Sequence, residues 1–350
     1  MTLLAFDWAF TLEKVILIAV IITVSLVVAM YATYAERKVA GFMQDRLGPN
    51  RAGPFGLLQP LADGLKLFFK EEVIPNNSNK FLFILGPCLA MLTAMMTSAV
   101  IPWGGTVELG GRMVDLQVAD INIGILYVFG VVSLGVYGMM IGGWASNNKF
   151  SLMAALRGAS QAISYELALG LALIALLMLT GSLSLKTITE QQIQGNWWNI
   201  VYQPLGFLIF FICAMAECNR APFDLPEAES ELNMGYHQEY SSMKLGFFLF
   251  FFFFNMFISC TILATLYFGG YDIPFVDESN LQGITAMIVG LIAIFGKTFI
   301  LIFIFMWIRW TLPRFRYDQL MNLGWKGLIP LAILNMLITA VVVLLTMKTH

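Results

Sequence analysis

Residues 245–268 read LGFFLFFFFFNMFISCTILATLYF, an apolar run of 24 residues that contains no charged side chain. A helix needs about 20 predominantly apolar residues to cross the hydrocarbon core of a bilayer. The run is long enough for that, and it is bounded by Lys244 on one side and Gly269 and Gly270 on the other. It therefore predicts a membrane-spanning helix.

The whole chain has the composition of an integral membrane protein. Of its 350 residues, 59% are hydrophobic and only 12% are charged, whereas soluble domains carry about 25% charged residues. The net charge of −2 gives no indication of nucleic acid binding. The N-terminal residues include Asp7 and Glu13 instead of the positive charge of a cleaved signal peptide, so we expect the first span to be retained.

Cysteine and histidine are too few and too scattered for metal or haem chemistry. The cysteines are Cys88, Cys213, Cys218 and Cys260, and the histidines are His237 and His350. No two cysteines form a CxxC pair, so neither an iron–sulfur nor a zinc framework is expected. We expect the chain to bind no cofactor itself, and any redox cofactors to be held by partner subunits.

Eight runs are apolar enough to be membrane spans. We expect them at 15–34, 81–102, 121–144, 161–180, 204–217, 245–268, 284–308 and 328–347. The connections on one side of the membrane are then 35–80, 145–160, 218–244 and 309–327. No internal repeat or linker divides the chain. The prediction is a single all-α polytopic membrane domain, 1–350, with about eight transmembrane helices and no β domain.

The distribution of lysine and arginine predicts the orientation. Fifteen of them lie on the side of the four connections just named and four lie on the opposite side, with Lys297 inside a span. Positive residues concentrate in cytoplasmic loops. We therefore expect the four connections to face the cytoplasm and both termini to lie on the periplasmic side of a bacterial inner membrane.

Connection 35–80 contains a predicted amphipathic helix over 57–70. Leucine and phenylalanine recur there at helical spacing, Asp63 and Lys66 lie between them, and Pro60 is tolerated in a first helical turn. Such a helix lies in the plane of the membrane interface. Two interpretations stay open, an interfacial anchor and a threshold past which a lipid-soluble ligand enters. The loop RLGPNRAG at 46–53 fits contact with lipid phosphates or with a partner subunit.

The connection that precedes the run 245–268 is rich in acidic residues. Residues 216–244 read AECNRAPFDLPEAESELNMGYHQEYSSMK, with six carboxylates against one arginine and one lysine. Pro226 in a first turn, Asp224 as a cap and Gly235 as an end predict a short helix on which Glu227 and Glu231 share a face. Interleaved apolar residues indicate that the segment folds back against protein, although a solvated acidic loop is the alternative.

Ionisable residues also occur inside the predicted spans, namely Glu166, Glu217 and Lys297. A charge at a helix centre costs about 2.5–3.5 kcal/mol on insertion scales, so such a residue is a functional hypothesis. Crowded carboxylates in a low dielectric have raised and coupled pKa values. A series of acids that are partly protonated near neutral pH is what a proton path requires. For Glu166 alone, a satisfied hydrogen bond between helices is the alternative.

Four long motifs resemble one family. They are ERKVAGFMQDRLGPNRAGPFG from Glu36, GGWASNNKFSLMAALRGASQAISYE from Gly142, NRAPFDLPEAESEL from Asn219 and LPRFRYDQLMNLGWK from Leu312. Across nearly its whole length the chain resembles the H-subunit family of bacterial respiratory NADH:quinone oxidoreductase (complex I), which is homologous to mitochondrial NADH dehydrogenase subunit 1. The resemblance implies a membrane subunit at the junction with the peripheral arm. It also implies quinone as substrate, with FMN and iron–sulfur clusters in partner subunits, and antiporter-like membrane subunits and lipids as further partners.

The resemblance also implies roles for individual residues. The quinone chamber would involve Arg37, Asp63, Lys66 and Phe223. The proton path would involve Glu36, Glu166, Glu217, Glu227, Glu229, Glu231 and Glu239, and we expect Asp224 of the same acidic connection to belong to it. Contacts of the loops with the peripheral arm would involve Arg46 and Arg51, and we expect Arg220 to make a loop or partner contact as well. Coupling between charges about 4–10 Å apart at an effective dielectric near 20 is worth a few kcal/mol, enough to shift a carboxylate pKa by more than one unit.

One position departs from the family pattern. Family members often carry a glutamate, in a Gly-Glu-Tyr context, in the span after the acidic connection, and the aligned residue here is Phe252. The nearest polar residue is Asn255. Either the proton route bypasses this span, or waters and Asn255 replace the acid.

Three other functions stay open at this point. The chain could be the homologous membrane anchor of an energy-converting hydrogenase, an independent ion channel or carrier, or a purely structural anchor. A carrier would favour inverted repeats with broken helices, which the sequence does not show. A structural anchor leaves the charges at Glu166 and Lys297 unexplained.

Overall fold

A computed structural model describes residues 8–109, 112–195, 197–273 and 284–347. Its long helices are α1 (Trp8–Met43), α3 (Lys80–Thr97), α4 (Gly124–Ala145), α5 (Lys149–Thr180), α10 (Ser242–Tyr267), α11 (Ile284–Thr311) and α13 (Ile329–Met347). Its shorter helices are α2 (Gln59–Phe69), α6 (Leu185–Gln194), α7 (Asn199–Tyr202), α8 (Pro204–Glu217), α9 (Glu229–Leu232) and α12 (Tyr317–Asn322). Strands β1 (Thr106–Leu109) and β2 (Arg112–Asp115) pair antiparallel as a small hairpin.

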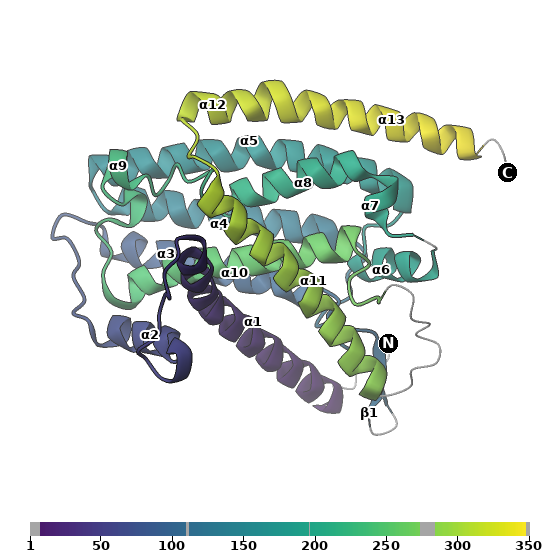
Figure 1. Cartoon of the computed structure of the whole chain (residues 1–350), viewed down its shortest axis with the longest axis horizontal. Helices are drawn as coiled ribbons and strands as arrows, with labels where there is room; N and C mark the ends of the chain where they lie inside the picture. Colours follow the sequence, from purple (N-terminus) through teal and green to yellow (C-terminus); the bar gives the residue numbers. More distant parts are fainter. Residues whose placement is uncertain (1–7, 110–111, 196, 274–283, 348–350) are drawn as a thin grey trace, which may run out of the picture.

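Helix α10, which contains the run 245–268, is the centre of the bundle. Of its most apolar window, 83% is buried inside the chain, against 22% for α1. Figure 1 shows α10 running through the middle of the molecule, and helices α1, α3, α8 and α11 all pack against it. A helix that is apolar all round is typically buried. The uncharged apolar run 245–268 therefore forms the core instead of a lipid-facing surface.

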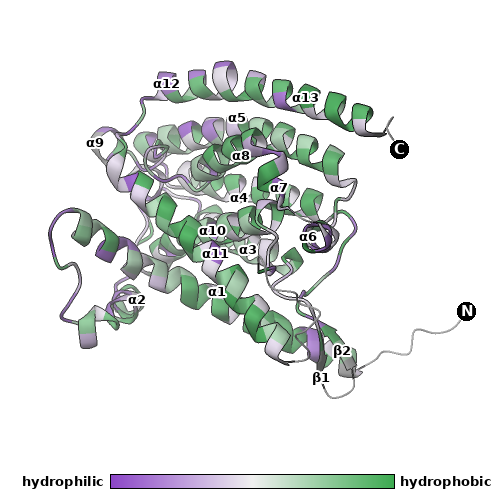
Figure 2. Cartoon of the chain, turned by 45° about the vertical axis from the view of Figure 1, so that its right-hand side comes forward, coloured by the Kyte–Doolittle hydropathy of each residue, from purple (hydrophilic) through white to green (hydrophobic). Residues whose placement is uncertain are grey.

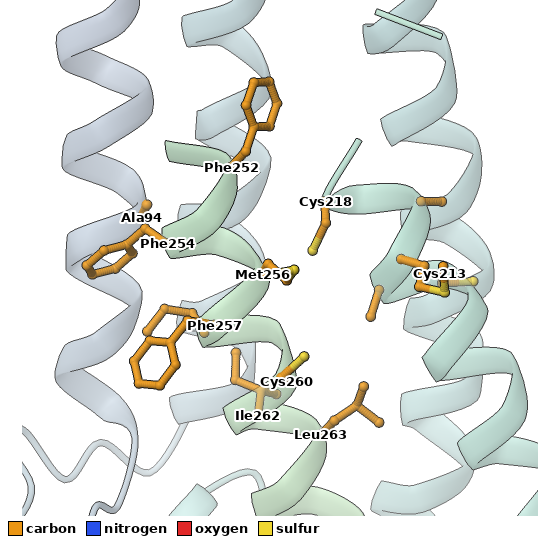
Figure 3. Close-up of a cluster of buried hydrophobic side chains, with 14 of the residues drawn as sticks. Ala94, Cys213, Cys218, Phe252, Phe254, Met256, Phe257, Cys260, Ile262 and Leu263 are labelled. Atoms are coloured by element: carbon orange, nitrogen blue, oxygen red, sulfur yellow. The ribbon is translucent and has the colours of Figure 1, made fainter. Parts of the chain in front are cut away.

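The core around α10 is built from phenylalanine, aliphatic side chains and thiols. Figure 3 shows Phe254 and Phe257 of α10 with Cys260, and Cys213 and Cys218 from the region of α8. These three cysteines are buried, and all four cysteines of the chain are free thiols. The packing agrees with their interpretation as small, weakly polar core residues.

Helices α1 and α13 are largely hydrophobic along their length (Figure 2), and many of their apolar side chains are exposed. Among the described residues, seven helical segments are long and apolar enough to cross a membrane. Helix α8 is also apolar but has only 14 residues. The all-α polytopic membrane fold predicted from the sequence is confirmed, and the single β-hairpin is far too small to be a β domain.

Two helices extend well beyond the spans predicted from hydropathy. Helix α1 continues to Met43, so Glu36 and Arg37 lie on a helix and not in a loop. Helix α5 begins at Lys149, where the Asn148 side chain accepts a hydrogen bond from the Phe150 amide (3.0 Å). Hydropathy marks the part of a helix that lies in lipid, whereas a helix ends where its backbone is capped. Most of connection 145–160 is therefore helical.

Lys297 has a structural role at the end of α10. Its ammonium group donates to the carbonyl oxygens of Phe268 (2.6 Å) and Gly270 (3.1 Å) and lies 4.6 Å from the ring centroid of Trp198. Unsatisfied carbonyls at a helix C-terminus favour a cation. This charge within a predicted span thus needs no functional explanation.

Helices α3 and α4 approach each other closely at glycines. A Cβ added at Gly138 would lie 2.7 Å from the backbone nitrogen of Ala90 and 2.9 Å from the carbonyl oxygen of Gly86. Small residues permit such an approach between membrane helices, where van der Waals packing drives association. Because the atoms in the way belong to backbone, they cannot be moved by a rotamer change.

We expect Gly138→Ala to force α3 and α4 apart and to destabilise the chain by about 1–3 kcal/mol, the usual cost of overpacking. The control is Gly130→Ala on the same helix, where nothing lies within 4 Å of an added Cβ. That change should stay within about 0.5 kcal/mol of the wild type. Thermal unfolding of the detergent-solubilised protein measures the difference. Identical melting temperatures for the two variants would contradict the close packing.

Candidate functional site

The four connections 35–80, 145–160, 218–244 and 309–327 meet at one end of the bundle, which we call the polar end. Direct contacts tie them together in pairs. Lys244 forms an ion pair with Glu72. Arg314 and Asp224 are 2.6 Å apart, and the Asn148 amide donates to Glu239 (2.8 Å). Helices α2 and α9 mark this end at the left of Figure 1.

Arg37 and Asp63 join the end of α1 to helix α2. The Arg37 guanidinium and the Asp63 carboxylate are 2.6 Å apart, and the Gln59 amide donates to the other carboxylate oxygen (3.0 Å). Lys66 is exposed and follows Asp63 by three residues, so the two lie on one face of α2. The polar group of α2 is therefore held in place by α1, with Lys66 beside it.

The apolar side of α2 is not covered by the described chain. Leu61, Leu65, Phe68 and Phe69 are all exposed, whereas Leu67 approaches Gly246 of α10. The amphipathic helix forms where the sequence predicts it, with Pro60 in its first turn. Its exposed apolar row is suited to lipid or to an apolar ligand.

Glu36, the residue before Arg37, points toward the interior of the bundle. It forms an ion pair with Arg309 near the end of α11, and the two side chains are 12% and 20% exposed. A buried ion pair of this kind loses much when one partner is removed, because the other charge stays in a low dielectric. Adjacent residues of α1 thus serve two different groups, Arg37 at α2 and Glu36 at α11.

A second set of charges surrounds Arg309. It interacts electrostatically with Asp224, Glu227 and Arg220 as well as with Glu36. Asp224 is buried, and burial raises its pKa to about 6. The nearby Glu227 charge adds to this rise in pKa, and Arg314 and Arg220 oppose it. Asp224 is therefore a buried carboxyl that titrates close to neutral pH.

The acidic connection does not form the helix predicted over 226–235. Helix α9 is a single turn, Glu229–Leu232, and it ends at Asn233 in the left-handed conformation (φ 49°). Asp224 accepts from Arg314 and does not cap a helix. Gly235 (φ 74°) packs directly on Pro226, since an added Cβ would lie 1.8 Å from the Pro226 carbonyl oxygen. The segment is a compact fold-back, held by its prolines and by this contact.

Glu227 and Glu231 consequently do not share a helix face. Glu231 is 57% exposed and forms an ion pair with Arg157 (2.8 Å), whereas Glu227 acts on buried Asp224. Glu239 accepts from Asn148 at the start of α5. The side chain of Glu229 lies outside the described residues. The acids of this connection thus occupy different environments.

Two further carboxylates lie between helices, deeper in the bundle. Ser133 of α4 donates a hydrogen bond to Glu166 of α5. Glu217, at the end of α8, interacts electrostatically with Glu166. Glu217 and Ser259 line a small cavity of about 20 Å³, which is roughly the size needed for one water. These two acids form a pair separate from the charges around Arg309.

Arg220 lies over the residue that departs from the family pattern. Its guanidinium carbon is 5.4 Å from the ring centroid of Phe252 and 4.4 Å from that of Phe253. A guanidinium over an aromatic face is stabilised by a cation–π interaction. The Asn255 amide donates to the Glu217 backbone carbonyl (3.5 Å) and not to a carboxylate. Aromatic faces therefore surround the arginine at the position where a glutamate is absent.

The remaining predicted residues lie in two kinds of place. Phe223 is buried between Tyr165 and Phe315, with ring centroids 5.5 Å away in each case. These ring neighbours belong to α5 and to the segment before α12, and not to the Arg37–Asp63 pair. Arg46 and Arg51 are exposed on the loop after α1. Across residues 8–347, less the gaps given above, no group of three or more His, Cys, Asp or Glu side chains could hold a metal ion.

Sequence reasoning missed the basic partners of the buried acids. Arg309 and Arg314 were counted only as positive charges that predict the membrane orientation. No pattern in the sequence pointed to Ser133. Each of the two arginines follows the last apolar residues of a span and lies at or just before a motif of the family. That position, at the end of a helix that packs on the core, was the available signal.

Known proteins match the chain almost end to end. The family model described as NADH dehydrogenase matches residues 15–340. An H subunit of NADH-quinone oxidoreductase from Cytophaga hutchinsonii is 64% identical over 96% of this chain and 98% of its own length. The H subunit from Flavobacterium johnsoniae is 61% identical over 96% of each chain. The second of the H subunits from Geobacter metallireducens is 46% identical over 97% of this chain and 98% of its own.

This similarity confirms the family that the four motifs predict. Identities of this size over nearly the full length favour it over the hydrogenase anchors, carriers and structural anchors considered above. The chain belongs to the NADH dehydrogenase family, together with the H subunits of NADH-quinone oxidoreductases.

Proposed function

We propose that this chain is the membrane subunit of NADH-quinone oxidoreductase in which quinone meets the polar group of α1 and α2 and in which proton coupling begins. It is not an enzyme by itself, since the complex supplies NADH oxidation through other subunits. FMN and iron–sulfur clusters are expected in those partners, and quinone is the substrate that this chain helps to bind.

The observation that carries the proposal is the pair of neighbours Glu36 and Arg37. Arg37 holds Asp63 on α2, and Glu36 holds Arg309 among the buried charges. Because Glu36 and Arg37 are neighbours in the sequence, a change of charge near Arg37 and Asp63 occurs close to the buried Glu36–Arg309 ion pair. Charges this close couple by a few kcal/mol at an effective dielectric near 20.

A quinone needs hydrogen-bond donors for its headgroup and an apolar surface for its tail. Arg37 and Lys66 are the donors at α2, and the exposed row of Leu61, Leu65 and Phe69 is the apolar surface. We propose that the tail crosses this row from the membrane, so α2 is a threshold as well as an anchor. Phe223 stays a prediction from the family resemblance, since its ring lies in the core.

We propose that the proton path starts with Glu36, Asp224 and Glu227 around Arg309 and continues to Glu217 and Glu166. Support comes from the raised pKa of Asp224 and from the cavity at Glu217, which is large enough for one water. Glu231, which is itself exposed, and Glu239, whose partner is the neutral Asn148, would lie at its edge, and Glu229 stays a prediction. Arg220 would act as a fixed positive charge between the two groups of acids.

The partner surfaces follow from this assignment. Arg46 and Arg51 on the exposed loop would face the peripheral arm, and the α4–α5 surface near Glu166 would face the antiporter-like membrane subunits. The polar end would then lie in the cytoplasm and both termini on the periplasmic side of a bacterial inner membrane. The excess of lysine and arginine at the polar end supports this orientation.

Replacing Lys66 with Met tests the quinone site. We expect the apparent KM for quinone to rise about tenfold, since a hydrogen bond from a charged donor is worth about 1.5–3 kcal/mol. Lys70→Met is the matched control, because Lys70 is also exposed and follows Lys66 by one turn. Steady-state kinetics with short-tailed and long-tailed quinones measure both variants. Unchanged kinetics for Lys66→Met with both quinones would remove this residue from the site.

A further inference from the structure

The chain breaks its helical path at Gln203, at the end of the bundle opposite the polar end. Gln203 has φ −133° and ψ 62° and separates α7 from α8. At 1.5 Å per residue, the 14 residues of α8 span about 21 Å, less than the hydrocarbon core of about 30 Å. Backbone that is not helical at membrane depth must find hydrogen-bond partners inside the protein.

Buried side-chain amides hold the helices together around this break by bonding to their backbone carbonyls. The Gln192 amide donates to the Thr265 carbonyl oxygen (3.0 Å), and the Asn199 amide donates to the Leu266 carbonyl oxygen (2.8 Å). The Gln203 amide nitrogen donates to the Ala175 carbonyl oxygen (2.9 Å) and to the Thr339 hydroxyl (3.0 Å). These bonds fix the orientation of the Gln203 amide, because its nitrogen must face two acceptors.

Three polar atoms in this region have no hydrogen-bond partner within the described ranges. They are Gln203 Oε1, Asn335 Nδ2 and Tyr267 Oη. They come from the start of α8, from α13 and from the end of α10, and each residue is at most 6% exposed. Buried polar groups without a partner are rare, because each would lose its hydrogen bonds to water.

All three atoms face the same space beside Gly206. From the position of a Cβ added at Gly206, Gln203 Oε1 is 2.8 Å away, Asn335 Nδ2 is 3.3 Å away and Tyr267 Oη is 3.5 Å away. A side chain at Gly206 would crowd these atoms, so glycine is what allows the three polar atoms to come together against this part of the α8 backbone. One acceptor, one donor and one hydroxyl that can do either thus surround a single point.

We propose that Gln203, Asn335 and Tyr267 bind one buried water molecule beside Gly206. A water can donate to Gln203 Oε1, accept from Asn335 Nδ2 and use the Tyr267 hydroxyl in either direction. Buried waters typically make about three hydrogen bonds to otherwise unsatisfied groups. The three residues carry no ionised group, so the site fits a neutral ligand and not an ion. This water joins α8, α10 and α13 where α8 begins.

The test is a cryo-EM map of the intact membrane complex at a resolution that resolves ordered waters. We expect a discrete density within hydrogen-bond distance of Gln203 Oε1, Asn335 Nδ2 and Tyr267 Oη. An empty space with the three side chains in these positions overturns the proposal. So does a direct hydrogen bond between the Gln203 and Asn335 amides in place of the density.

Two variants identify the ligands of the water. Asn335→Leu removes one amide, and Tyr267→Phe removes only a hydroxyl and keeps the ring against Phe207 and Phe210. We expect the density to be lost in Asn335→Leu and lost or displaced in Tyr267→Phe. Thr346→Val, on the same helix as Asn335, is the control and should leave it unchanged. A density that persists unmoved in both site variants would show that these residues do not bind it.

Discussion

Replacing Arg309 with Met is expected to destabilise the chain by about 3–5 kcal/mol and to abolish most quinone-dependent NADH oxidation. The change leaves the Glu36 carboxylate, which is 12% exposed, without its counter-charge. It also removes the cation that Asp224 and Glu227 share. Measurements of assembled subunit in membranes, thermal unfolding of the complex and quinone reductase rate together record the effect.

The double variant Glu36→Gln with Arg309→Met separates a lost ion pair from a lost arginine. If burial of an unpaired carboxylate is the cause, removing that charge should restore much of the stability of Arg309→Met. Arg316→Met is the control, because Arg316 and its partner Asp318 are 75% and 60% exposed, and exposed pairs contribute about 0–1 kcal/mol. Equal losses from Arg309→Met and Arg316→Met would refute the buried ion pair.

The fold was predictable because hydropathy is a property of single segments. The run 245–268 predicts a helix by its own composition, and so do the other long helices. What the sequence did not predict is that this run is the core, since burial depends on which helices surround it. Helix α1 likewise extends to Met43 because nothing in AERKVAGFM breaks a helix, whereas hydropathy alone stops at Tyr34.

The candidate site was predictable only as a set of residue types. Arg37, Asp63 and Glu36 were predicted from the family resemblance, and the structure brings the first two together. The partner of Glu36 lies 273 residues away in the sequence, so no local pattern could identify Arg309. The prediction of a helix over 226–235 was wrong for a similar reason. Pro226 and Gly235 do shape the local backbone as expected of such residues. The contacts of Asp224 with Arg314 and of Gly235 with Pro226, however, fold the segment back on itself instead of forming a helix.

The acids of connection 218–244 should differ sharply in their effect on activity, because they differ in environment. We expect Asp224→Asn and Glu227→Gln each to lower quinone-linked NADH oxidation by about tenfold, which corresponds to about 1.4 kcal/mol of activation free energy. Both changes remove a titratable charge from the buried group around Arg309. Glu231→Gln, at an exposed ion pair with Arg157, should stay within about twofold of the wild type.

The pH dependence provides the sharper test of the same prediction. Burial raises the pKa of Asp224 from 3.8 to about 6, so the folded chain binds this proton over a range in which the unfolded chain has released it. The contribution of Asp224 to the free energy of unfolding should therefore fall as pH rises from about 4 to about 6 and stay constant above. In Asp224→Asn the free energy of unfolding should lose this dependence on pH. The wild-type complex should show a change in quinone reductase rate near pH 6, and this change should be absent in Asp224→Asn. NADH oxidation with an artificial acceptor at the peripheral arm should be normal in all three variants. If Glu231→Gln impaired quinone reduction as strongly as Asp224→Asn, burial would not determine which acidic residues take part in proton coupling.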